Sequence, residues 1–426
     1  MLRLIKKIIP KTIFSFYHLF LSWFGALWYG FPSKKLHIVG ITGTKGKTTT
    51  VELANLFLEA AGYTTAIAGT LRFKIAGASE RNNLKMTMPG RFFIQRFLRK
   101  AVSAKCQYAI IEMSSEGAKQ FRHCFIDIDT IIFTNLSPEH IESHGSYEKY
   151  KQAKLSIAKT LGNSKKTKTR IVVNKDDVAA EEFLAIKADE KYGYSIKSLD
   201  SYALTHNGLE FTAAGTKMES GLRGEFNLYN IVAAITFAQT QGIELQVIKK
   251  ALREFGGIRG RVEYVTVKAE GEKKQNFDVI IDYAHTPNSL KQLYAAFDTR
   301  QKICVLGGTG GGRDTWKRPE MGRIVAKHCK EIILTNEDPY DEDPKKIIFD
   351  IAAGITNKKA QIILDRREAI RNAIQKAREN DVILITGKGT DPYIMGPENS
   401  KIEWDDAAVA REELSLFFSK QNLEQH

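Results

Sequence analysis

The residues with the clearest chemical potential form a glycine-rich loop between a strand-like run and a helical pattern. The stretch from Gly40 to Thr50 reads GITGTKGKTTT. Backbone N–H groups in such a loop and at the helix N-terminus can hold phosphate oxygens, and Lys47 adds a positive charge. The hydroxyl of Thr48 can ligate Mg²⁺. Gly40 lies one residue too far from Gly46 for the standard spacing, but the flanking strand and helix still predict a nucleotide site.

Three further side chains occupy positions from which they could contribute to the same site as this loop. Glu112 lies near the end of the apolar run Tyr108–Met113, and His140 follows the strand-like run Thr130–Phe133. Lys154 lies 14 residues after His140, on a helical pattern. The carboxyl ends of parallel strands border the crevice in which open α/β sheets bind ligands. A single histidine or lysine is usually solvated surface, but this combination predicts a Mg²⁺–ATP site.

The elements that must position these residues alternate between short apolar runs and helical patterns from Leu36 onward. This alternation predicts an α/β fold with a mostly parallel sheet and crossover helices. Strands are expected over residues 36–41, 108–113, 130–133 and 170–174, helices over 51–61 and 147–160, and a hairpin over 204–218.

A glycine-containing tract, Phe255–Gly260, predicts a hinge between two domains. After it a second α/β pattern begins, with strands expected over residues 278–282, 303–306, 331–335 and 382–386. We therefore expect an apolar N-terminal helical segment at 1–35, a central ATP-binding domain at 36–258 and a Rossmann-like C-terminal domain at 259–426.

The N-terminal segment Thr12–Phe31 carries no Lys, Arg, Asp or Glu and is rich in Trp, Tyr and Phe. About 20 apolar residues can span a bilayer as a helix, but this stretch also contains Ser15, His18 and Ser22. Its aromatic side chains suit a membrane interface. Two interpretations therefore stay open, a helix packed on protein and a helix associated with a membrane surface.

Composition limits the class of protein further. The chain has 426 residues, 43% hydrophobic and 26% charged, which excludes a disordered or collagen-like protein. A net charge of +14 favours anionic partners, but no basic stripe interleaved with aromatics predicts nucleic-acid binding. Cys106, Cys124, Cys304 and Cys329 show no CxxC spacing. We expect reduced thiols in a cytoplasmic protein, with neither a disulfide framework nor a zinc site.

Ten motifs then follow one another in a fixed order. They are TGTKGKTTT, IIEMSSEG, FTNLSPEHIESHG, YKQAK, GEFNLYN, GRVE, DYAHTP, GGGRDTWKRPEMG, DRREAI and GKG. With them the chain, from about Leu36 to Glu413, resembles the Mur ligase family and most closely its tripeptide synthetase (MurE-type) branch. The resemblance implies an ATP-dependent ligase of peptidoglycan synthesis. ATP phosphorylates a carboxylate of a muramoyl peptide, and the amine of an amino acid attacks the acyl phosphate.

The resemblance also implies a role for each matching residue. The implied catalytic residues are Lys47, Glu112, His140 and Lys154, and those that contact two Mg²⁺ ions are Thr48, Glu112, His140 and a carbamoylated Lys154. The implied nucleotide-binding residues are Thr42, Gly43, Thr44, Lys45, Gly46, Lys47, Thr48, Thr49, Asn227, Asn230, Asp282, His285 and Arg313. The implied residues for the muramoyl peptide or the amino acid are Thr87, Ser115, Arg122, Asp338, Tyr340, Gly387 and Asp391.

Four departures from the family pattern bear on the substrates. The family's N-terminal uridine-nucleotide-binding domain has no counterpart among the residues before the phosphate loop. Tyr340 stands where members that select diaminopimelate carry arginine, and a tyrosine cannot form that bidentate ion pair. Asp391 replaces the glutamate of the family's GKGHE motif, and Glu116 replaces the histidine of its SSHG motif. Lysine or another amino acid therefore becomes plausible.

Two other functions stay open. One is a ligase of the same architecture that acts on another carboxylate, as in cyanophycin or folylpolyglutamate synthesis, and the other is a non-catalytic ATP-binding scaffold. The acceptor could be nucleotide-linked or lipid-linked. We expect a cytoplasmic monomer without a nucleic-acid partner, located at the inner face of the cytoplasmic membrane if residues 12–31 associate with it.

Overall fold

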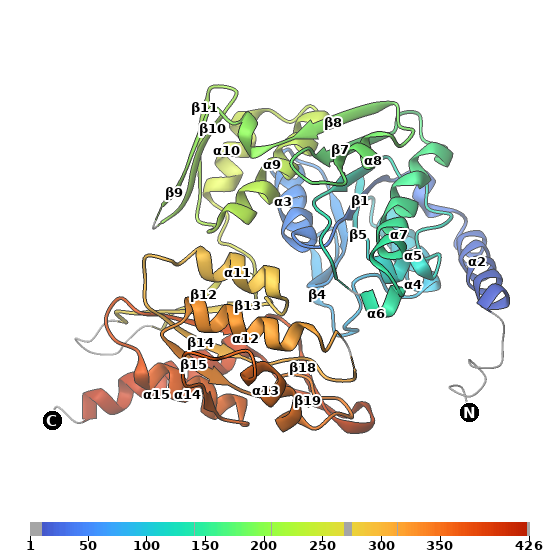
Figure 1. Ribbon diagram of the computed structural model, residues 1–426. Coiled ribbons are helices and arrows are strands. Elements are labelled where there is room, and N and C mark those ends of the chain that lie inside the picture. The colour runs from blue at the N-terminus through green and yellow to red at the C-terminus, as the bar shows by residue number, and fades with distance from the viewer. Residues whose placement is uncertain (1–10, 140, 206, 268–274, 313, 424–426) are drawn as a thin grey trace. The chain divides into compact units, whose positions relative to one another are not determined.

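The computed structural model describes residues 11–139, 141–205, 207–267, 275–312 and 314–423. The chain folds as two compact units (Figure 1). The first comprises Met1–Gly221 with Glu225–Phe255, and the second comprises Leu222–Gly224 with Gly256–His426. The last crossing from the first unit to the second falls between Phe255 and Gly256, within the glycine-containing tract Phe255–Gly260.

Among the described residues, the first unit is built on an eight-stranded sheet. Its strands, in spatial order, are β4 (Ala78–Arg81), β3 (Arg72–Ile75), β2 (Thr65–Ala68), β5 (Tyr108–Glu112), β1 (His37–Thr42), β6 (Thr130–Phe133), β7 (Arg170–Asn174) and β8 (Glu190–Tyr194). The six strands from β2 to β8 pair in parallel, and β3 and β4 add an antiparallel edge. Both faces of β5 and β6 are buried, which explains their unbroken apolar runs. The expected parallel sheet is confirmed.

Helices α3 to α8 lie along the chain between strands of this sheet, and α9 and α10 follow its last strand and the separate sheet described below. They are α3 (Lys47–Ala60), α4 (Arg91–Ser103), α5 (Ser115–Lys119), α6 (Ile141–His144), α7 (Tyr147–Lys159), α8 (Ala180–Leu184), α9 (Glu225–Thr240) and α10 (Leu245–Arg253), with short 3-10 turns η2 (Thr160–Asn163) and η3 (Ile196–Ser198). Helix α3 begins at Lys47 rather than at the expected Val51, because its polar first turn adds nothing to the apolar pattern. Strands β9 (Ser201–Thr205), β10 (Gly208–Ala213) and β11 (Thr216–Ser220) form a separate antiparallel sheet where a hairpin was expected.

The N-terminal helix α2 (Lys11–Trp28) packs one side on α4 and is followed by the 3-10 turn η1 (Pro32–Lys35). The Ser22 hydroxyl donates to the Phe121 carbonyl (2.8 Å), and the rings of Phe24 and Phe92 meet edge to face at 5.9 Å. Protein packing therefore accounts for one side of this helix. Across the described residues, no helix combines the length and the apolar character needed to cross a membrane.

Within its described residues, the second unit carries a six-stranded sheet. The spatial order is β12 (Glu263–Val265), β13 (Asp278–Asp282), β17 (Val382–Thr386), β14 (Lys302–Leu306), β15 (Glu331–Leu334) and β16 (Gln361–Ile362). All neighbours pair in parallel except β12 with β13. The remaining elements are α11 (Pro287–Ala295), α12 (Lys317–His328), α13 (Pro344–Ala352), α14 (Arg366–Lys376), α15 (Asp406–Leu423), η4 (Pro397–Asn399) and the strand pair β18 (Tyr393–Met395) and β19 (Lys401–Glu403). The four strands expected here are confirmed.

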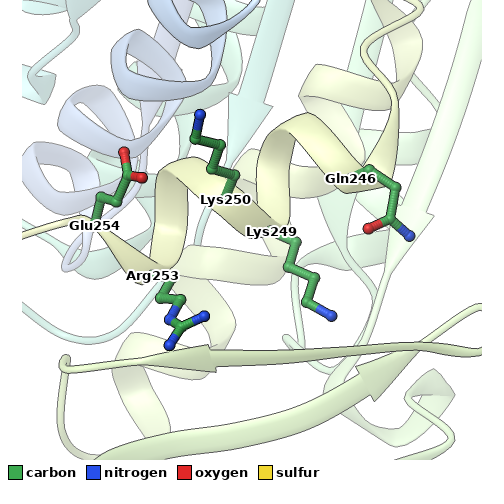
Figure 2. Close-up of a pocket in the computed structure, with 5 residues that line it drawn as sticks. All are labelled: Gln246, Lys249, Lys250, Arg253 and Glu254. Atoms are coloured by element: carbon green, nitrogen blue, oxygen red, sulfur yellow. The ribbon is translucent and has the colours of Figure 1, made fainter.

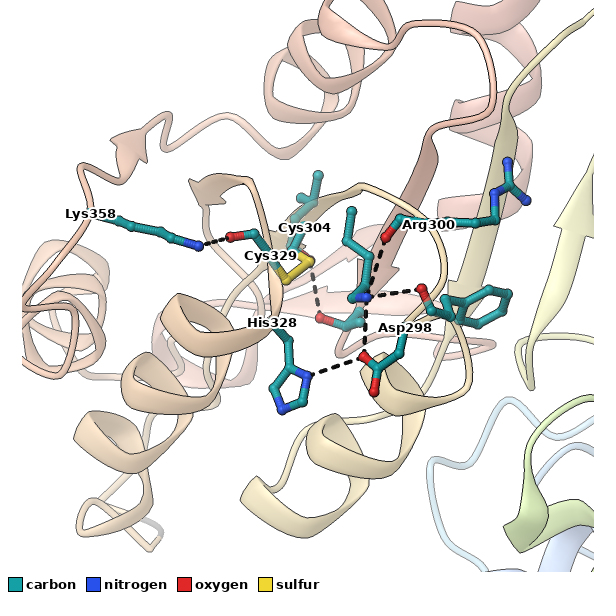
Figure 3. Close-up of a disulfide and its surroundings, with 10 residues drawn as sticks. Asp298, Arg300, Cys304, His328, Cys329 and Lys358 are labelled. Carbon is teal, nitrogen blue, oxygen red and sulfur yellow. Dashed lines mark hydrogen bonds and ion pairs between the residues drawn. A yellow bond between two sulfur atoms is a disulfide. The ribbon is translucent and has the colours of Figure 1, made fainter.

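Cys304 and Cys329 form a disulfide in this unit, so the expectation of four reduced thiols was wrong (Figure 3). Cys304 lies in β14, and Cys329 follows α12 directly before β15. Because α12 crosses from one strand to its parallel neighbour, it returns Cys329 beside Cys304, with the Cα atoms 6.1 Å apart. A separation of 25 residues hides this proximity from a search for close spacing. Cys106 and Cys124 keep free thiols.

We expect this disulfide to raise the free energy of unfolding by about 3 kcal/mol, because it closes a long loop of the unfolded chain. Thiol titration of the denatured, unreduced protein should find two thiols of the four cysteines. The double variant Cys304→Ala/Cys329→Ala should unfold at lower denaturant concentration, whereas Cys124→Ala serves as a control outside the bond. Four titratable thiols in the freshly purified protein would contradict the bond.

Candidate functional site

The phosphate loop fills the turn between β1 and α3 and needs glycine at two positions. Gly43 and Gly46 have φ angles of 149° and 80°, in the region that favours glycine. A Cβ atom on Gly43 would lie 1.9 Å from the Thr134 hydroxyl, and one on Gly46 would lie 2.1 Å from Asn230 Oδ1. The loop is therefore packed between the end of β6 and α9 with no room for a side chain at either position.

Hydrogen bonds hold the loop against the segment that follows β6. The Thr44 amide donates to the Asn135 carbonyl (2.8 Å), and the Lys45 amide donates to Asn135 Oδ1 (2.9 Å). Thr134 Oγ1 donates to the Lys45 carbonyl (2.7 Å), and the Thr44 hydroxyl meets the Tyr150 hydroxyl at 2.9 Å. These bonds fix the loop backbone in one conformation.

Lysine side chains gather around the loop. Lys47 Nζ donates to the Gly43 carbonyl (3.0 Å), and Lys154 Nζ, from α7, donates to the same oxygen (2.6 Å). Lys45 pairs with Glu139 at 2.9 Å. Burial, and then the positive charge of Lys47, hold the pKa of Lys154 well below its ordinary value. A phosphate anion at this loop would compensate the concentrated positive charge.

Thr48 and Glu112 offer oxygen donors beside the loop. Thr48 Oγ1 lies 3.2 and 3.1 Å from the two carboxylate oxygens of Glu112, and the Thr70 amide donates to Glu112 Oε2 (2.9 Å). Mg²⁺ commonly binds through one or two carboxylates together with substrate phosphates and water. The part of the chain that is described holds no cluster of three or more His, Cys, Asp or Glu residues able to bind a metal. Thr48 and Glu112 therefore fit an ion that also needs the nucleotide.

Other expected nucleotide contacts lie around the same loop. The Thr42 hydroxyl, at the end of β1, is buried and has no hydrogen-bond partner within the described residues. Thr49 is buried in the first turn of α3. On α9, Asn230 lies against Gly46 of the loop, and its Nδ2 donates to Asn227 Oδ1 at 3.1 Å. His140 and Arg313, two of the expected contacts, lie outside the described residues.

The residues expected to hold the muramoyl peptide lie on or near the segment after β5. Ser115 Oγ lies 3.2 Å from His144 Nε2. Arg122 donates to the Met88 carbonyl and to Gln120 Oε1, the latter at 2.8 Å. Thr87 Oγ1 meets Thr70 Oγ1 at 2.9 Å, and the Thr70 amide is the one that binds Glu112. Thr87 is thus linked to the metal donors through one residue.

Two arginines concentrate positive charge near this segment. Burial lowers the pKa of Arg122, while burial and then the charge of Arg122 lower the pKa of Arg91. Arg91 also contacts His18 of α2. Neighbouring guanidinium groups are typical of sites that bind carboxylates or phosphates.

In the second unit, the side chains of Asp282 and His285 form hydrogen bonds with nearby backbone groups. Asp282 closes β13 and accepts from the amides of Val262 (2.9 Å) and Ala284 (2.7 Å). His285 Nδ1 donates to the Tyr283 carbonyl (2.7 Å), which orients the imidazole ring.

The residues expected near the amino acid converge at one edge of this sheet. Lys388 is fully buried and pairs with Asp338 at 2.8 Å, while Asp391 lies 3.5 Å from its Nζ. A Cβ on Gly387, whose φ is 106°, would lie 2.2 Å from Glu337 Oε2. That Glu337 oxygen is buried without a partner in the described structure, and burial followed by the charge of Asp338 raises the Glu337 pKa.

Tyr340 adopts an unusual conformation beside this cluster. Its φ is 53°, in the left-handed region, and its amide donates to the Met395 carbonyl at 3.1 Å. Arg318, which lies in the motif GGGRDTWKRPEMG, is buried and pairs with Glu342 (2.7 Å) and Asp350 (2.8 Å). Arg318 therefore has a structural role in this unit.

Sequence reasoning missed Tyr150, Glu139, His144 and Glu337. Tyr150 contacts Thr44 of the loop, and Glu139 pairs with Lys45. Sequence spacing does not reveal either contact. His144 lies in the motif FTNLSPEHIESHG, and the second histidine of that motif was a signal that could have identified it. For Glu337, the only signal was its place beside Asp338.

A surface pocket of about 520 Å³ lies at helix α10 (Figure 2). Its lining comes from α10 and consists of Gln246, Lys249, Lys250, Arg253 and Glu254. Arg253 also pairs with Glu219 of β11 at 3.0 Å. None of the expected site residues lines this pocket, so its size alone does not make it the functional site.

Comparison with known proteins agrees with the geometry. Residues 41–238 match the Mur ligase middle domain, and residues 260–389 match the Mur ligase, glutamate ligase domain. The UDP-N-acetylmuramoyl-L-alanyl-D-glutamate–2,6-diaminopimelate ligase of Bacillus cereus is 35% identical over 403 residues, which cover 91% of this chain and 80% of that protein. The UDP-N-acetylmuramyl-tripeptide synthetase of Roseiflexus sp. is 35% identical over 419 residues, covering 92% and 81%.

Solved structures give the same result. A UDP-N-acetylmuramoyl-L-alanyl-D-glutamate–2,6-diaminopimelate ligase superimposes with a TM-score of 0.60 at 27% identity, over 90% of this chain and 79% of that one. The folylpolyglutamate synthase of Mycobacterium tuberculosis gives a TM-score of 0.70 at 14% identity, over 94% and 95% of the chains. The second likeness concerns the fold alone.

The crowding at Gly46 predicts a specific loss of nucleotide binding. Gly46→Ala should weaken ATP binding by roughly tenfold or more, because the methyl group would displace Asn230 and the loop. Gly62→Ala is the matched control, since Gly62 also has a positive φ (88°) but a Cβ there would meet no atom within 4 Å. Titration of both variants with a fluorescent ATP analogue separates crowding from backbone strain. Equal affinities would contradict the loop assignment.

Proposed function

Because this chain belongs to the Mur ligase family, we propose that residues 36–258 form its ATP-binding domain and residues 259–426 its C-terminal ligase domain. The chain is an ATP-dependent acid–amino-acid ligase of peptidoglycan synthesis that uses Mg²⁺. It adds an amino acid to a muramoyl peptide. The observation that carries the site assignment is the arrangement of Lys47 and Lys154 on one carbonyl, beside Thr48 and Glu112.

The ATP loop would bind the phosphates through its backbone amides and Lys47. The acceptor carboxylate oxygen attacks the γ-phosphorus, so an acyl phosphate forms and ADP leaves. Mg²⁺, held by Thr48 and Glu112, would neutralise phosphate charge. The amine of the amino acid then attacks the acyl carbon, and inorganic phosphate leaves as the amide forms. Lysine side chains near the loop stabilise the negative charge that these steps concentrate.

Lys154 is proposed to carry a carbamate. Only the neutral form of an amine reacts with CO₂, and the pKa of Lys154 is lowered by burial and by Lys47. Carbamoylation would replace a buried cation with an anionic oxygen donor, which a hard metal ion prefers. The contact of Lys154 with the Gly43 carbonyl supports this proposal, because a carbamate on this side chain would lie at the phosphate loop.

The acceptor is proposed to lie along Thr87, Ser115 and Arg122. Thr87 is joined through Thr70 to Glu112, so a carboxylate near Thr87 would be close to the metal donors. Arg122 and Arg91 supply positive charge for the anionic groups of the muramoyl peptide. Association with a membrane surface, expected from residues 12–31, depends on α2 and not on this site.

The amino acid is proposed to bind near Asp338, Tyr340, Gly387 and Asp391. Tyr340 offers no guanidinium for a distal carboxylate. Of the acidic side chains nearby, Asp338 and Asp391 lie 2.8 and 3.5 Å from the Lys388 ammonium. An amino acid without a distal carboxylate, such as lysine, suits this environment better than diaminopimelate, which carries both a distal ammonium and a distal carboxylate.

The direct test is phosphate release with Mg²⁺–ATP and a UDP-linked muramoyl dipeptide, across lysine, ornithine, diaminopimelate and neutral amino acids. We expect turnover with a basic amino acid and little with diaminopimelate. Preference for diaminopimelate would contradict the interpretation of Tyr340, while leaving the ligase reaction intact. Absence of turnover with every amino acid would contradict the UDP-linked acceptor.

Lys154→Ala should lower ligation by roughly 100- to 1,000-fold, as expected for loss of one positioned charge. A short carboxylic acid such as acetate should restore part of the activity, because it can supply the missing carboxylate oxygens. Lys159→Ala, an exposed lysine on the same helix, is the matched control. Initial rates with and without acetate provide the measurement. Full activity of Lys154→Ala would exclude the carbamate role.

A further inference from the structure

One side of helix α2 exposes a continuous stripe of large apolar side chains. Phe16, Phe20, Trp23 and Leu27 recur at helical spacing and are 72, 48, 41 and 47% exposed. Trp28, at the end of the helix, is 69% exposed. The opposite side is buried against the protein, as Ser22 and Ala26 show. The stripe therefore has no partner within the described part of the chain.

Three elements at this stripe carry basic residues and no acidic ones. None of α2, η1 and α4 contains an aspartate or a glutamate. Lys34 and Lys35 are exposed at the C-terminal side of the helix, and Arg96 and Lys100 are exposed on α4. Figure 1 places α2 at the periphery of the first unit, beside α4. The aromatic stripe thus lies beside elements whose own charged residues are all basic, while Asp127 contacts η1 through Ser33.

We propose that this face of α2 docks the protein flat on an anionic membrane surface. Phe and Trp side chains bury their apolar bodies at the boundary between head groups and acyl chains. Exposed lysines and arginines beside them attract anionic head groups. A second copy of the chain is a poorer occupant, because pairing the same faces would bring basic elements against one another.

The docking surface is joined to the proposed acceptor segment, and this link rests on the proposed function. Ser22 donates to the Phe121 carbonyl, one residue before Arg122, and His18 contacts Arg91. The bilayer surface would thereby lie close to the residues assigned to the muramoyl peptide. Docking itself can be measured without any substrate, so it can fail or succeed independently of the ligase assignment.

The test is co-sedimentation of the purified full chain with vesicles of phosphatidylcholine and phosphatidylglycerol, against vesicles of phosphatidylcholine alone. We expect binding to the anionic vesicles that weakens at high salt. The triple variant Phe16→Gln/Phe20→Gln/Trp23→Gln should bind at least about tenfold more weakly, since one fully buried large apolar side chain is worth about that factor. Phe349→Gln/Ile402→Gln/Leu416→Gln, at comparably exposed positions, is the matched control and should bind normally.

Two further measurements test whether α2 contacts the lipid and whether the variants are folded. Brominated lipids should quench the fluorescence of the wild type, and Trp23→Phe/Trp28→Phe should lose that quenching. Circular dichroism and ATP turnover with a soluble acceptor report whether the variants fold. Absence of wild-type binding at low salt, or binding unchanged in the triple variant, would overturn the proposal. Concentration-dependent self-association that the triple variant abolishes would overturn it in favour of a protein interface.

Discussion

The side-chain nitrogens of Lys47 and Lys154 share the carbonyl oxygen of Gly43, and the proposed ATP site depends on this arrangement. Lys47 and Lys154 come from different helices, and both donate to the same backbone carbonyl. Burial and the charge of Lys47 disfavour the charged form of Lys154 and lower its pKa. Such a site is electrostatically incomplete without an anion. The constraint explains why Gly43 and Gly46 carry no side chains, since the loop must approach β6 and α9 closely to hold both amines.

Most of the central architecture could be predicted because its signals are local. Apolar runs give buried parallel strands, and a glycine-rich loop between strand and helix gives an anion site. The position of Glu112 beside the loop followed from the rule that parallel strands end at one edge, whereas Lys154 lies on helix α7 and its role was implied by the family resemblance. The start of α3 could not be placed well, because a polar first turn carries no hydrophobic period.

Contacts between residues far apart in the sequence could not be predicted from the sequence alone. The Cys304–Cys329 bond depends on how α12 returns the chain to a neighbouring strand, and the thiols are far apart in sequence. Lys388 and Asp338 illustrate the same limit in a charged pair. A fully buried ammonium needs a counter-charge, and Asp338 supplies it from a different loop. The two motifs that differ from the family pattern therefore meet in space.

The hydrogen bond from Ser22 to the Phe121 carbonyl has a consequence for how ligands of this protein influence one another. If the segment at Phe121 shifts when an acceptor enters, the contact that holds α2 must shift with it. Thermodynamic linkage is reciprocal, so any factor by which a bound acceptor strengthens surface attachment equals the factor by which attachment strengthens acceptor affinity. The Ser22 side chain would then couple attachment at a surface to the affinity for the acceptor.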